Sequence, residues 1–389
     1  MKKNLFILLS CLAIYSCGNT QELSNNNPNF YDPSLNIYNP NNGASDISKR
    51  AVDGVRPKIV IKNTYLKVHK EVGVLIHDLF GELVSKVQSE PVNFDDVNSF
   101  SVSVHQAKLT MTGKDMDNLM KYFVLNYPGA PLKELKHTIK VGGRINIQGK
   151  MKQAGLDVPF EMEGPIRATP DGLMILDPDT VKTLGIPAKG LMDLLGIETQ
   201  KLLNLNEQRG LKLVGNSILM FPSRLFPPPV MNGKVFRVET ENDALHIYFD
   251  DGTKLKRPPL PVQEGLFKNY KHVYGGAVRM IGNETHENTN ILMVDMNQSN
   301  PFEFYLSEYV NHTVAGQVNI LGKNGALINY MPDYSDIPKR LGKIPKFDNI
   351  DDGLSNDKWR LNPESDPGLE KRKAWASQPV PQPINQYPR

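Results

Sequence analysis

A run of alternating side chains between residues 132 and 151 constrains the fold more than any other feature of the sequence. The odd positions carry Leu135, His137, Ile139, Val141, Ile145, Ile147 and Met151, whereas the even positions carry Lys136, Thr138, Lys140, Arg144, Asn146, Gln148 and Lys150. A period of two predicts extended chain with one dry face and one wet face. Gly142-Gly143 interrupts the run and marks a bend or a tight turn.

Further segments with strand character surround this run. Two short apolar runs, with Ile59 and Ile61 in the first and residues 74–79 as the second, open the body. Others are expected at 100–111, 156–168, 209–221, 230–239, 244–250, 270–281, 289–296 and 313–331. Turn residues such as Pro170-Asp171-Gly172, Asn232-Gly233 and Asp251-Gly252 separate them.

Only two regions have helical periodicity. Between Lys114 and Tyr127, an apolar stripe follows the spacing of a helix, Thr112 and Asp115 form a capping-box-like start, and Pro128-Gly129 stops the helix. A second helical region is expected from Asp179 to about Asn204, interrupted at Gly185-Ile186-Pro187 and Gly196. Two helical regions among many strands predict an α+β protein, in which a long curved antiparallel sheet wraps around a few helices.

The N-terminus has the pattern of a bacterial lipoprotein signal. Lys2 and Lys3 precede an apolar run from Leu5 to Tyr15, which is too short to span a bilayer, and Cys17 follows it. Cleavage before Cys17 removes Cys11, so Cys17 becomes the single cysteine of the mature chain and is predicted to be the acyl attachment point. A secretory signal with an incidental cysteine is the alternative, and a cleavage site at Cys11 fits less well. By resemblance to enterobacterial sorting rules, Gly18 after the cysteine favours the outer membrane, with the protein facing the periplasm; surface exposure is not excluded.

Both ends of the mature chain have the composition of disordered segments. Residues 17–56 are rich in asparagine and are expected to form a tether with an end-to-end distance of roughly 35 Å. Residues 335–389 are rich in proline and alternating charge, and they hold both tryptophans, Trp359 and Trp375. These tryptophans are expected either to contact the body or to dock a protein partner.

Removing Lys2 and Lys3 from a chain of net charge +3 leaves 3 − 2 = +1, which predicts no general affinity for nucleic acid.

No catalytic, metal or cofactor motif stands out. The nucleophile elbow, the zinc-binding helix motif and the glycine-rich phosphate loops are absent from the sequence, and the eight histidines have no ligand spacing. His137 lies on the dry face of its strand and is best explained as a hydrogen-bonded core residue. Acidic pairs at Asp95-Asp96, Asp177/Asp179 and Asp250-Asp251 lie beside turn residues. They are assigned to turns and caps, with a hydrolase built on paired carboxylates as the alternative.

A bias towards methionine marks the apolar residues of the body. Met111, Met116, Met120, Met151, Met162, Met174, Met192 and Met220 fall between residues 111 and 220. Methionine is suited to line a space for flexible apolar ligands, although on an amphipathic stripe it is more often core filler.

Several short sequence patterns follow one another in an order that resembles a known protein family. They are the strand-to-helix join at 109–120, the strand at Pro159-Phe160-Glu161, the hairpin at 169–176, the segmented helix at 185–196, the strand pair at 210–219 and the stretch 227–235. Over about residues 94–238 this order resembles the LmeA-like phospholipid-binding family, which is similar to the tubular lipid-binding superfamily of bactericidal/permeability-increasing protein. The resemblance implies a groove for acyl chains and brings no catalytic residue with it.

The sequence therefore predicts a non-enzymatic lipoprotein that binds phospholipid or another acyl lipid for carriage or presentation. The expected organisation is a signal peptide at 1–16, the tether at 17–56, a lipid-binding body at 57–264, a β-rich continuation at 265–334 and the tail at 335–389.

The expected groove residues are Met116, Leu119, Met120, Phe123, Leu191, Leu194 and Leu195. Contact with anionic headgroups is assigned to Lys136, Lys140, Arg144 and Lys150, for which a solvated strand face is the alternative. The rival functions are a scaffold lipoprotein that recruits a partner through its tail and, less favoured, a lipid- or glycan-modifying hydrolase.

Overall fold

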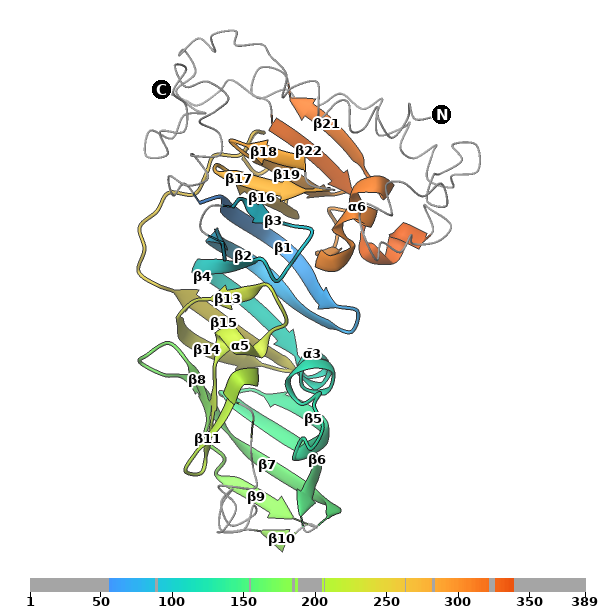
Figure 1. Ribbon diagram of the computed structural model, residues 1–389. Coiled ribbons are helices and arrows are strands. Elements are labelled where there is room, and N and C mark those ends of the chain that lie inside the picture. Colours follow the sequence, from blue (N-terminus) through green and yellow to red (C-terminus); the bar gives the residue numbers. More distant parts are fainter. Residues whose placement is uncertain are drawn as a thin grey trace.

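The computed structural model describes an elongated, mostly β protein with large antiparallel sheets and few short helices (Figure 1). It describes residues 56–87, 90–153, 155–183, 186–187, 205, 207–262, 264–281, 284–321 and 326–338. The expected sheet component of the fold is therefore confirmed. Cys17, the tether as far as residue 55, Trp359 and Trp375 lie outside the described residues, as does nearly all of the tail.

An 11-stranded sheet forms one half of the body. Its main path runs through β14 (Val235–Glu241), β15 (Ala244–Asp250), β4 (Phe100–Thr112), β2 (Val72–Ser85), β1 (Lys58–His69), β16 (Tyr270–Tyr274), β19 (Asn290–Asp295), β22 (Ala326–Met331) and β21 (Gln317–Leu321). Two short strands, β13 (Val230–Asn232) and β20 (Phe302–Tyr305), pair in parallel with β4 and β1. Because β16 pairs directly with β1, most strands after residue 265 belong to the same sheet as the start of the body; β17 and β18 are the exceptions.

An eight-stranded sheet forms the other half. It contains β5 (Leu132–Lys140), β6 (Arg144–Gln153), β7 (Leu156–Ala168), β8 (Met174–Leu176), β9 (Thr180–Thr183), β10 (Ile186–Pro187), β11 (Leu211–Val214) and β12 (Ser217–Met220). A third, three-stranded sheet joins β18 (Glu284–Glu287), β17 (Ala277–Met280) and β3 (Val92–Asn93).

The alternating run at 132–151 folds as the hairpin β5–β6. Gly142 and Gly143 have φ angles of +86° and +78°, so the glycine pair forms a tight turn and not a bend within one strand. Ile139, Ile145 and Ile147 are buried, whereas Lys136 and Gln148 are exposed, as the alternation predicts. Two residues depart from the pattern. Val141 lies in the turn, where 72% of its surface is exposed, and Asn146, expected on the solvent face, is only 6% exposed because its amide donates to Glu161 at 2.8 Å.

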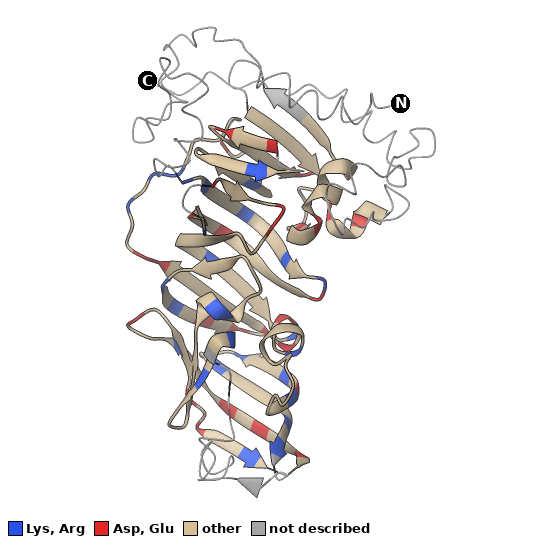
Figure 2. Ribbon diagram, viewed as in Figure 1, with Lys and Arg blue, Asp and Glu red and all other residues tan. Residues whose placement is uncertain are grey.

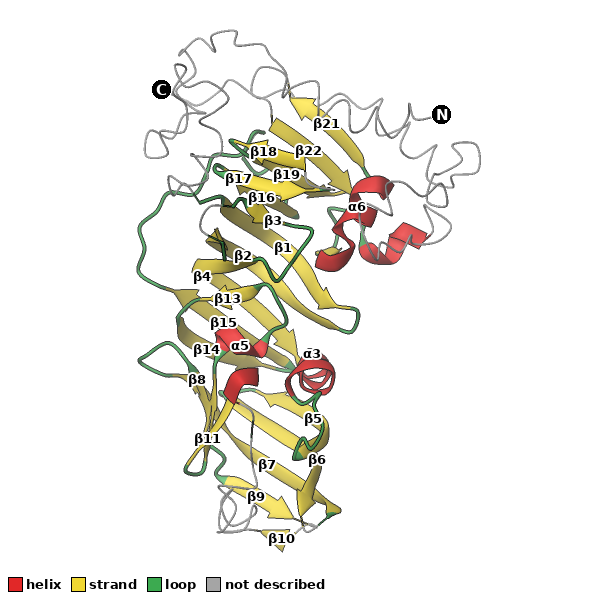
Figure 3. Cartoon of the chain, in the orientation of Figure 1, coloured by secondary structure: helices red, strands yellow, loops and turns green. Residues whose placement is uncertain are grey.

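Within the described residues, the helices are few and short (Figure 3). They are α3 (Gly113–Leu119), the π-helix η2 (Met120–Val124), α5 (Pro222–Leu225), α6 (Tyr309–Ala315) and the 3₁₀ turns η4 (Glu207–Arg209), η5 (Leu306–Glu308) and η7 (Tyr334–Asp336). α3 and η2 confirm the helix expected at 114–127, although it ends three residues early, at Val124.

Two expectations about secondary structure are wrong. The helical region expected from Asp179 to about Asn204 is wrong at its start, because Thr180–Thr183 form the edge strand β9, with Val181 buried opposite Met162 of β7. Residues 188–204 lie outside the described residues, so the rest of that region stays a prediction. The strand expected over 313–331 begins in α6, which ends at Ala315 before β21 starts.

A single apolar cluster extends through both large sheets. It includes Ile61 and Ile291 in the first sheet, Met116 in α3, and Phe160 and Ile218 in the second sheet. A smaller cluster lies on the opposite face of the first sheet, where Val60, Leu292 and Ile328 pack beneath the strap of residues 251–269 that joins β15 to β16. The larger cluster therefore forms the shared interior of the body.

Candidate functional site

The helix with the predicted groove residues starts at the junction of the two large sheets (Figure 1). β4 ends at Thr112, whose hydroxyl accepts the Asp115 N–H at 3.2 Å, while the Asp115 carboxylate accepts the Thr112 N–H at 2.9 Å. This capping box satisfies backbone donors that the first helical turn leaves without partners. The hydroxyl of Tyr65 in β1 donates to Asp115 Oδ1 at 2.7 Å, so the helix start is fastened to the first sheet.

The same helix is also fastened to the second sheet. A Cβ on Gly113 would lie 2.3 Å from the carbonyl oxygen of His137 in β5, so only glycine permits this approach. Asp117 Oδ1 accepts the His137 N–H at 2.7 Å and lies 2.8 Å from His137 Nδ1. His137 is therefore a buried, hydrogen-bonded residue, as predicted, and it holds α3 against β5.

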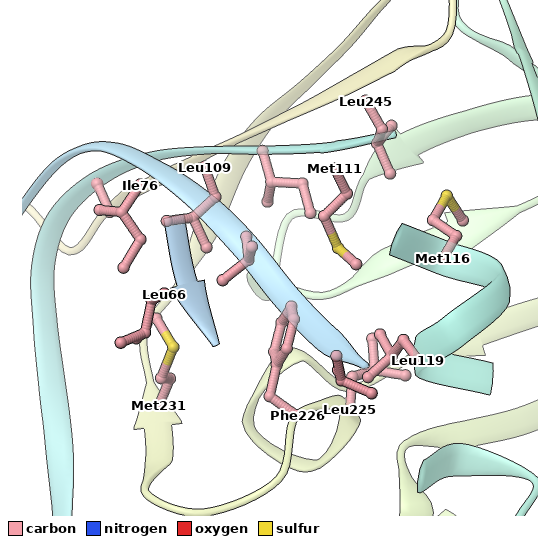
Figure 4. Packing of buried hydrophobic residues seen from close by; sticks show 14 of the residues in the cluster. Leu66, Ile76, Leu109, Met111, Met116, Leu119, Leu225, Phe226, Met231 and Leu245 are labelled. Carbon is pink, nitrogen blue, oxygen red and sulfur yellow. The ribbon is translucent and has the colours of Figure 1, made fainter. Parts of the chain in front are cut away.

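The predicted groove residues of this helix face the shared interior (Figure 4). Met116, Leu119 and Met120 are at most 6% exposed, and Phe123 is partly buried against the same cluster. Figure 4 shows Met116 and Leu119 on α3, with Met111 at the end of β4 and Leu225 and Phe226 nearby. Leu191, Leu194 and Leu195 lie outside the described residues.

Arg209 closes the end of this helical segment. Its guanidinium donates to the carbonyl oxygen of Phe123 at 2.6 Å and lies over the Phe123 and Tyr127 rings, 5.6 Å and 5.9 Å from their centroids. The Phe123 carbonyl also accepts the Asn126 N–H at 3.3 Å, so the cation adds a second hydrogen bond to it and interacts favourably with the negative end of the helix.

Methionines continue this interior into the second sheet. Met151, Met162, Met174 and Met220 are buried in the same cluster, and Met174 is paired with Met220 across β8 and β12. Their unbranched side chains adapt their shape more readily than leucine or isoleucine.

The predicted headgroup residues lie on β5 and β6, where basic and acidic bands occur side by side (Figure 2). Lys140 lies 2.5 Å from Glu163, Arg144 lies 2.6 Å from Asp179, and Lys150 lies 2.6 Å from Glu134. Hydrogen bonds from Lys140 lower the pKa of Glu163, and those from Arg144 lower the pKa of Asp179. Carboxylates thus already neutralise these three cations, and Lys136 alone of the four has no ion pair with a described residue.

The acidic pairs have separate hydrogen-bonding partners. Asp95 accepts from the Ile281 N–H and the Tyr309 hydroxyl, and Asp96 accepts from the Asn98 N–H. Asp177 accepts from Arg167 and Ser217, whereas Asp179 binds Arg144. Asp250 and Asp251 accept backbone N–H groups of their own turn, and Asp251 also lies 2.7 Å from His105 Nδ1. Turn contacts therefore account for Asp96 and Asp250 and in part for Asp251, whereas Asp95, Asp177 and Asp179 bind groups of other elements, which the assignment to turns and caps did not predict.

Sequence reasoning missed a buried polar cluster between β16, β19, β22 and α6. It contains Asn269, Lys271, Asp295, Asn311, His312, Thr313, Asn329 and Asp333, each at most 5% exposed. The only signal in the sequence is the loss of alternation at Tyr270-Lys271-His272-Val273, where polar side chains occur on both faces of one strand. Both faces of β16 are in fact buried.

Burial controls the protonation of this cluster. Desolvation lowers the pKa of Lys271 well below its usual range and lowers the pKa of His312 to about 3. Desolvation also raises the pKa of Asp295 to about 7 and raises that of Asp333. The amine, the imidazole and the acids are thereby shifted towards their neutral forms.

Within the described ranges, no group of three or more His, Cys, Asp or Glu side chains is arranged to hold a metal ion, and no helix is long and apolar enough to cross a membrane. Comparison with protein families, curated proteins and solved structures gives no significant match. The resemblance to the LmeA-like family therefore stays a prediction.

Proposed function

We propose that the protein is an outer-membrane lipoprotein, facing the periplasm, that binds phospholipid or another acyl lipid in its shared interior for carriage or presentation. The observation that carries the proposal is the single apolar cluster that runs from the first sheet, past α3, into the second sheet. An acyl chain is long, narrow and apolar, and an elongated apolar interior matches that shape. In this proposal the sheets curve around α3 and η2 in the manner of a tubular lipid-binding fold.

The energetics of chain burial are sufficient for reversible binding. Burying an acyl chain of about 16 carbons at ~0.8 kcal/mol per methylene gives an upper limit near ~12 kcal/mol before ordering costs. No strong polar contact is then required. This is consistent with a strand face on which Lys140, Arg144 and Lys150 already have carboxylate partners.

The methionines provide the adaptability that such binding needs. Met111, Met116 and Met120 lie at the junction of the sheets, and Met151, Met162, Met174 and Met220 continue into the second sheet. Because their side chains are at most 7% exposed, lipid entry requires them to change rotamer and move apart. Methionine does this at lower cost than a β-branched residue.

Native mass spectrometry after gentle purification tests whether lipid is bound. The expected result is a mass increment that is released by organic extraction and identified as an acyl lipid. A protein that remains ligand-free after purification and after incubation with phospholipid vesicles contradicts the proposal.

A matched pair of substitutions locates the binding region. Met120 and Met280 are 6% and 5% exposed in the same cluster, but Met280 belongs to the three-stranded sheet. If lipid lies against α3 and η2, Met120→Gln lowers the affinity for lipid, as measured by displacement of a fluorescent lipid, and the protein still folds. Met280→Gln lowers stability by about 2 kcal/mol or more, because it buries an unpaired amide, and leaves lipid affinity unchanged. Full lipid binding by Met120→Gln, or its complete unfolding, contradicts the assignment.

The tight burial of Met116, Leu119 and Met120 favours one alternative, a scaffold lipoprotein whose interior is filled by its own side chains. In that case Met120→Gln and Met280→Gln lose similar stability, and neither changes a lipid signal. The tail at 335–389 would then be the segment to test for binding of a protein partner.

A further inference from the structure

Lys271 is an amine enclosed in the centre of the first sheet. It lies in β16, between β1 and β19, and faces the same side as its register partners Ile61 and Met293. Lys271 is 4% exposed, and its Nζ has no hydrogen-bond partner. It lies 3.9 Å and 3.0 Å from the ring centroids of Phe302 and Phe304. An ordinary structural lysine ends in solvent or in an ion pair, and this one ends on two phenyl rings.

Asp295 is the diagonal neighbour of Lys271 on the adjacent strand. Lys271 pairs with Met293, and Asp295 lies two residues further along β19, on the same face. Diagonal neighbours in a sheet are about 7–8 Å apart, within reach of a long side chain. Asp295 is completely buried, and its oxygens accept from the Asn297 N–H at 2.8 Å and the Asn269 amide at 3.1 Å.

A second buried carboxyl, that of Asp333, lies close to this pair. Met331 at the end of β22 is paired with Asp295, and Asp333 follows two residues later. Asp333 is 4% exposed and accepts the Glu303 N–H at 2.7 Å. The charges of Asp295 and Asp333 both act on the Lys271 amine, although no carboxylate comes within ion-pair distance of it.

We propose that Lys271 and Asp295 become joined by an intramolecular amide bond, with Asp333 as the proton carrier. The Lys271 Nζ attacks the Asp295 carboxyl carbon, so the Nζ–Cγ bond forms and the Cγ–OH bond breaks. Asp333 accepts a proton from the attacking nitrogen and returns it to the departing hydroxyl, which leaves as water. The step requires no oxidant, reductant or cofactor.

The surroundings favour this reaction over a salt bridge. In water an amine and a carboxylic acid exchange a proton and stop reacting, because the ammonium group is not a nucleophile. Burial opposes both charges here, since it lowers the pKa of Lys271 and raises that of Asp295 to about 7. Two fixed groups react with effective concentrations on the order of 10⁵ M or more, and the flexible stem of lysine lets Nζ move from the Phe304 ring to the carboxyl.

The product would be a covalent bond between β16 and β19 in the middle of the 11-stranded sheet. It would hold the segment after residue 265 to the rest of that sheet. The bond would form with or without bound lipid.

Tryptic digestion of the denatured full-length protein, followed by tandem mass spectrometry, tests the bond. Trypsin cannot cut after an acylated lysine, so residues 269–279 should remain together. They should be linked to the peptide 280–323, which contains Asp295, with the summed mass reduced by one water. Release of the free peptide 272–279 in the same yield as peptides from the rest of the chain overturns the proposal.

Two variants test the roles of the acids. Asp295→Ala should abolish the branched peptide and restore cleavage after Lys271, and a Lys271 that stays blocked overturns the choice of Asp295. Asp333→Asn should lower the linked fraction at a given time after synthesis by about tenfold or more. An unchanged linked fraction overturns the role of Asp333. The digest of the unaltered protein decides the bond itself, even where a variant fails to fold.

Discussion

The hydroxyl of Thr240 donates a hydrogen bond to the carbonyl oxygen of Lys140 at 2.6 Å and accepts the Gly143 N–H at 2.7 Å. Thr240 lies on β14, the last strand of the 11-stranded sheet, and Lys140 ends β5 in the eight-stranded sheet. A neighbouring bond from the Asp243 N–H to the Ile139 carbonyl, at 3.2 Å, repeats the link. One side chain thus joins the two halves of the body beside the helix α3.

Thr240→Val should lower the free energy of unfolding by about 1–3 kcal/mol. The substitution keeps the shape of the side chain but leaves the Lys140 carbonyl and the Gly143 N–H without their partner. Thr138→Val, on the exposed face of β5, is the matched control and should change stability by less than about 0.5 kcal/mol. Urea denaturation of both variants measures the difference. Equal effects would show that the hydroxyl does not stabilise the junction.

Protonation of His312 should lower the stability of the protein in acid. The Tyr305 N–H donates to His312 Nε2 at 3.0 Å, and Nδ1 lies 2.9 Å from the Pro332 carbonyl, so the neutral ring with a proton on Nδ1 satisfies both contacts. Burial lowers the pKa of His312 to about 3, whereas the unfolded chain titrates near ~6.5. The unfolded state therefore binds an extra proton between these values. The contribution of His312 is complete above pH ~6.5 and is lost as the pH falls towards 3.

Comparison of variants isolates this contribution from other titrating groups. Asp295, whose pKa is raised to about 7, acts in the opposite direction as the pH falls, and His272, whose pKa is lowered to about 4, acts in the same direction. Both groups are still present in the variant His312→Gln. Between pH 6 and pH 5, the free energy of unfolding should fall less in this variant than in the unaltered protein, and the difference should be up to ~1.4 kcal/mol. His69→Gln, at an exposed position, should match the unaltered protein. Parallel pH profiles for all three would refute the prediction.

A cut in the strap should leave the two fragments associated. Lys254 and Lys256 are exposed, and Arg257 holds the strap to the first sheet through two bonds to Asp78, at 2.7 Å and 2.8 Å. Because β16 after the strap pairs with β1 before it, the fragments share one sheet. Limited trypsin treatment should give two bands on a denaturing gel and one peak in native size exclusion. Two native peaks would instead indicate two separable domains.

Cys17→Ser should prevent acylation. Labelling with palmitate should disappear, and the protein should leave the membrane fraction, because loss of the buried acyl methylenes removes about 0.8 kcal/mol for each. A variant with a cleaved signal that stays bound to membranes would refute the anchor. The mass of the mature N-terminus confirms that cleavage has occurred before fractionation is interpreted.

Sequence patterns correctly predicted the elements that are held by contacts between residues close together in the chain. The Thr112–Asp115 capping box was visible because its two partners are three residues apart, and the β5–β6 hairpin was visible because the alternation resumes directly after Gly142-Gly143. The strand β9 was missed because it is short and its apolar residue, Val181, gains its burial from Met162 of β7. The burial of Lys271 was missed for the same reason, because nothing near it in the sequence indicates that both faces of β16 are covered.

The sequence by itself determined the mostly β character, the start of α3 and the dry face of the 132–151 hairpin, because alternation, capping and turn residues act over a few positions. The tertiary structure alone decided which distant strands became neighbours: β1 pairs with β16, and Thr240 meets Lys140. It also decided that Lys271, Asp295 and Asp333 share one dry interior. The physical reason is that strand pairing and desolvation depend on what covers a face, and the partners here are distant in the sequence: Ile61 and Lys271 are 210 residues apart, and Lys140 and Thr240 are 100 residues apart.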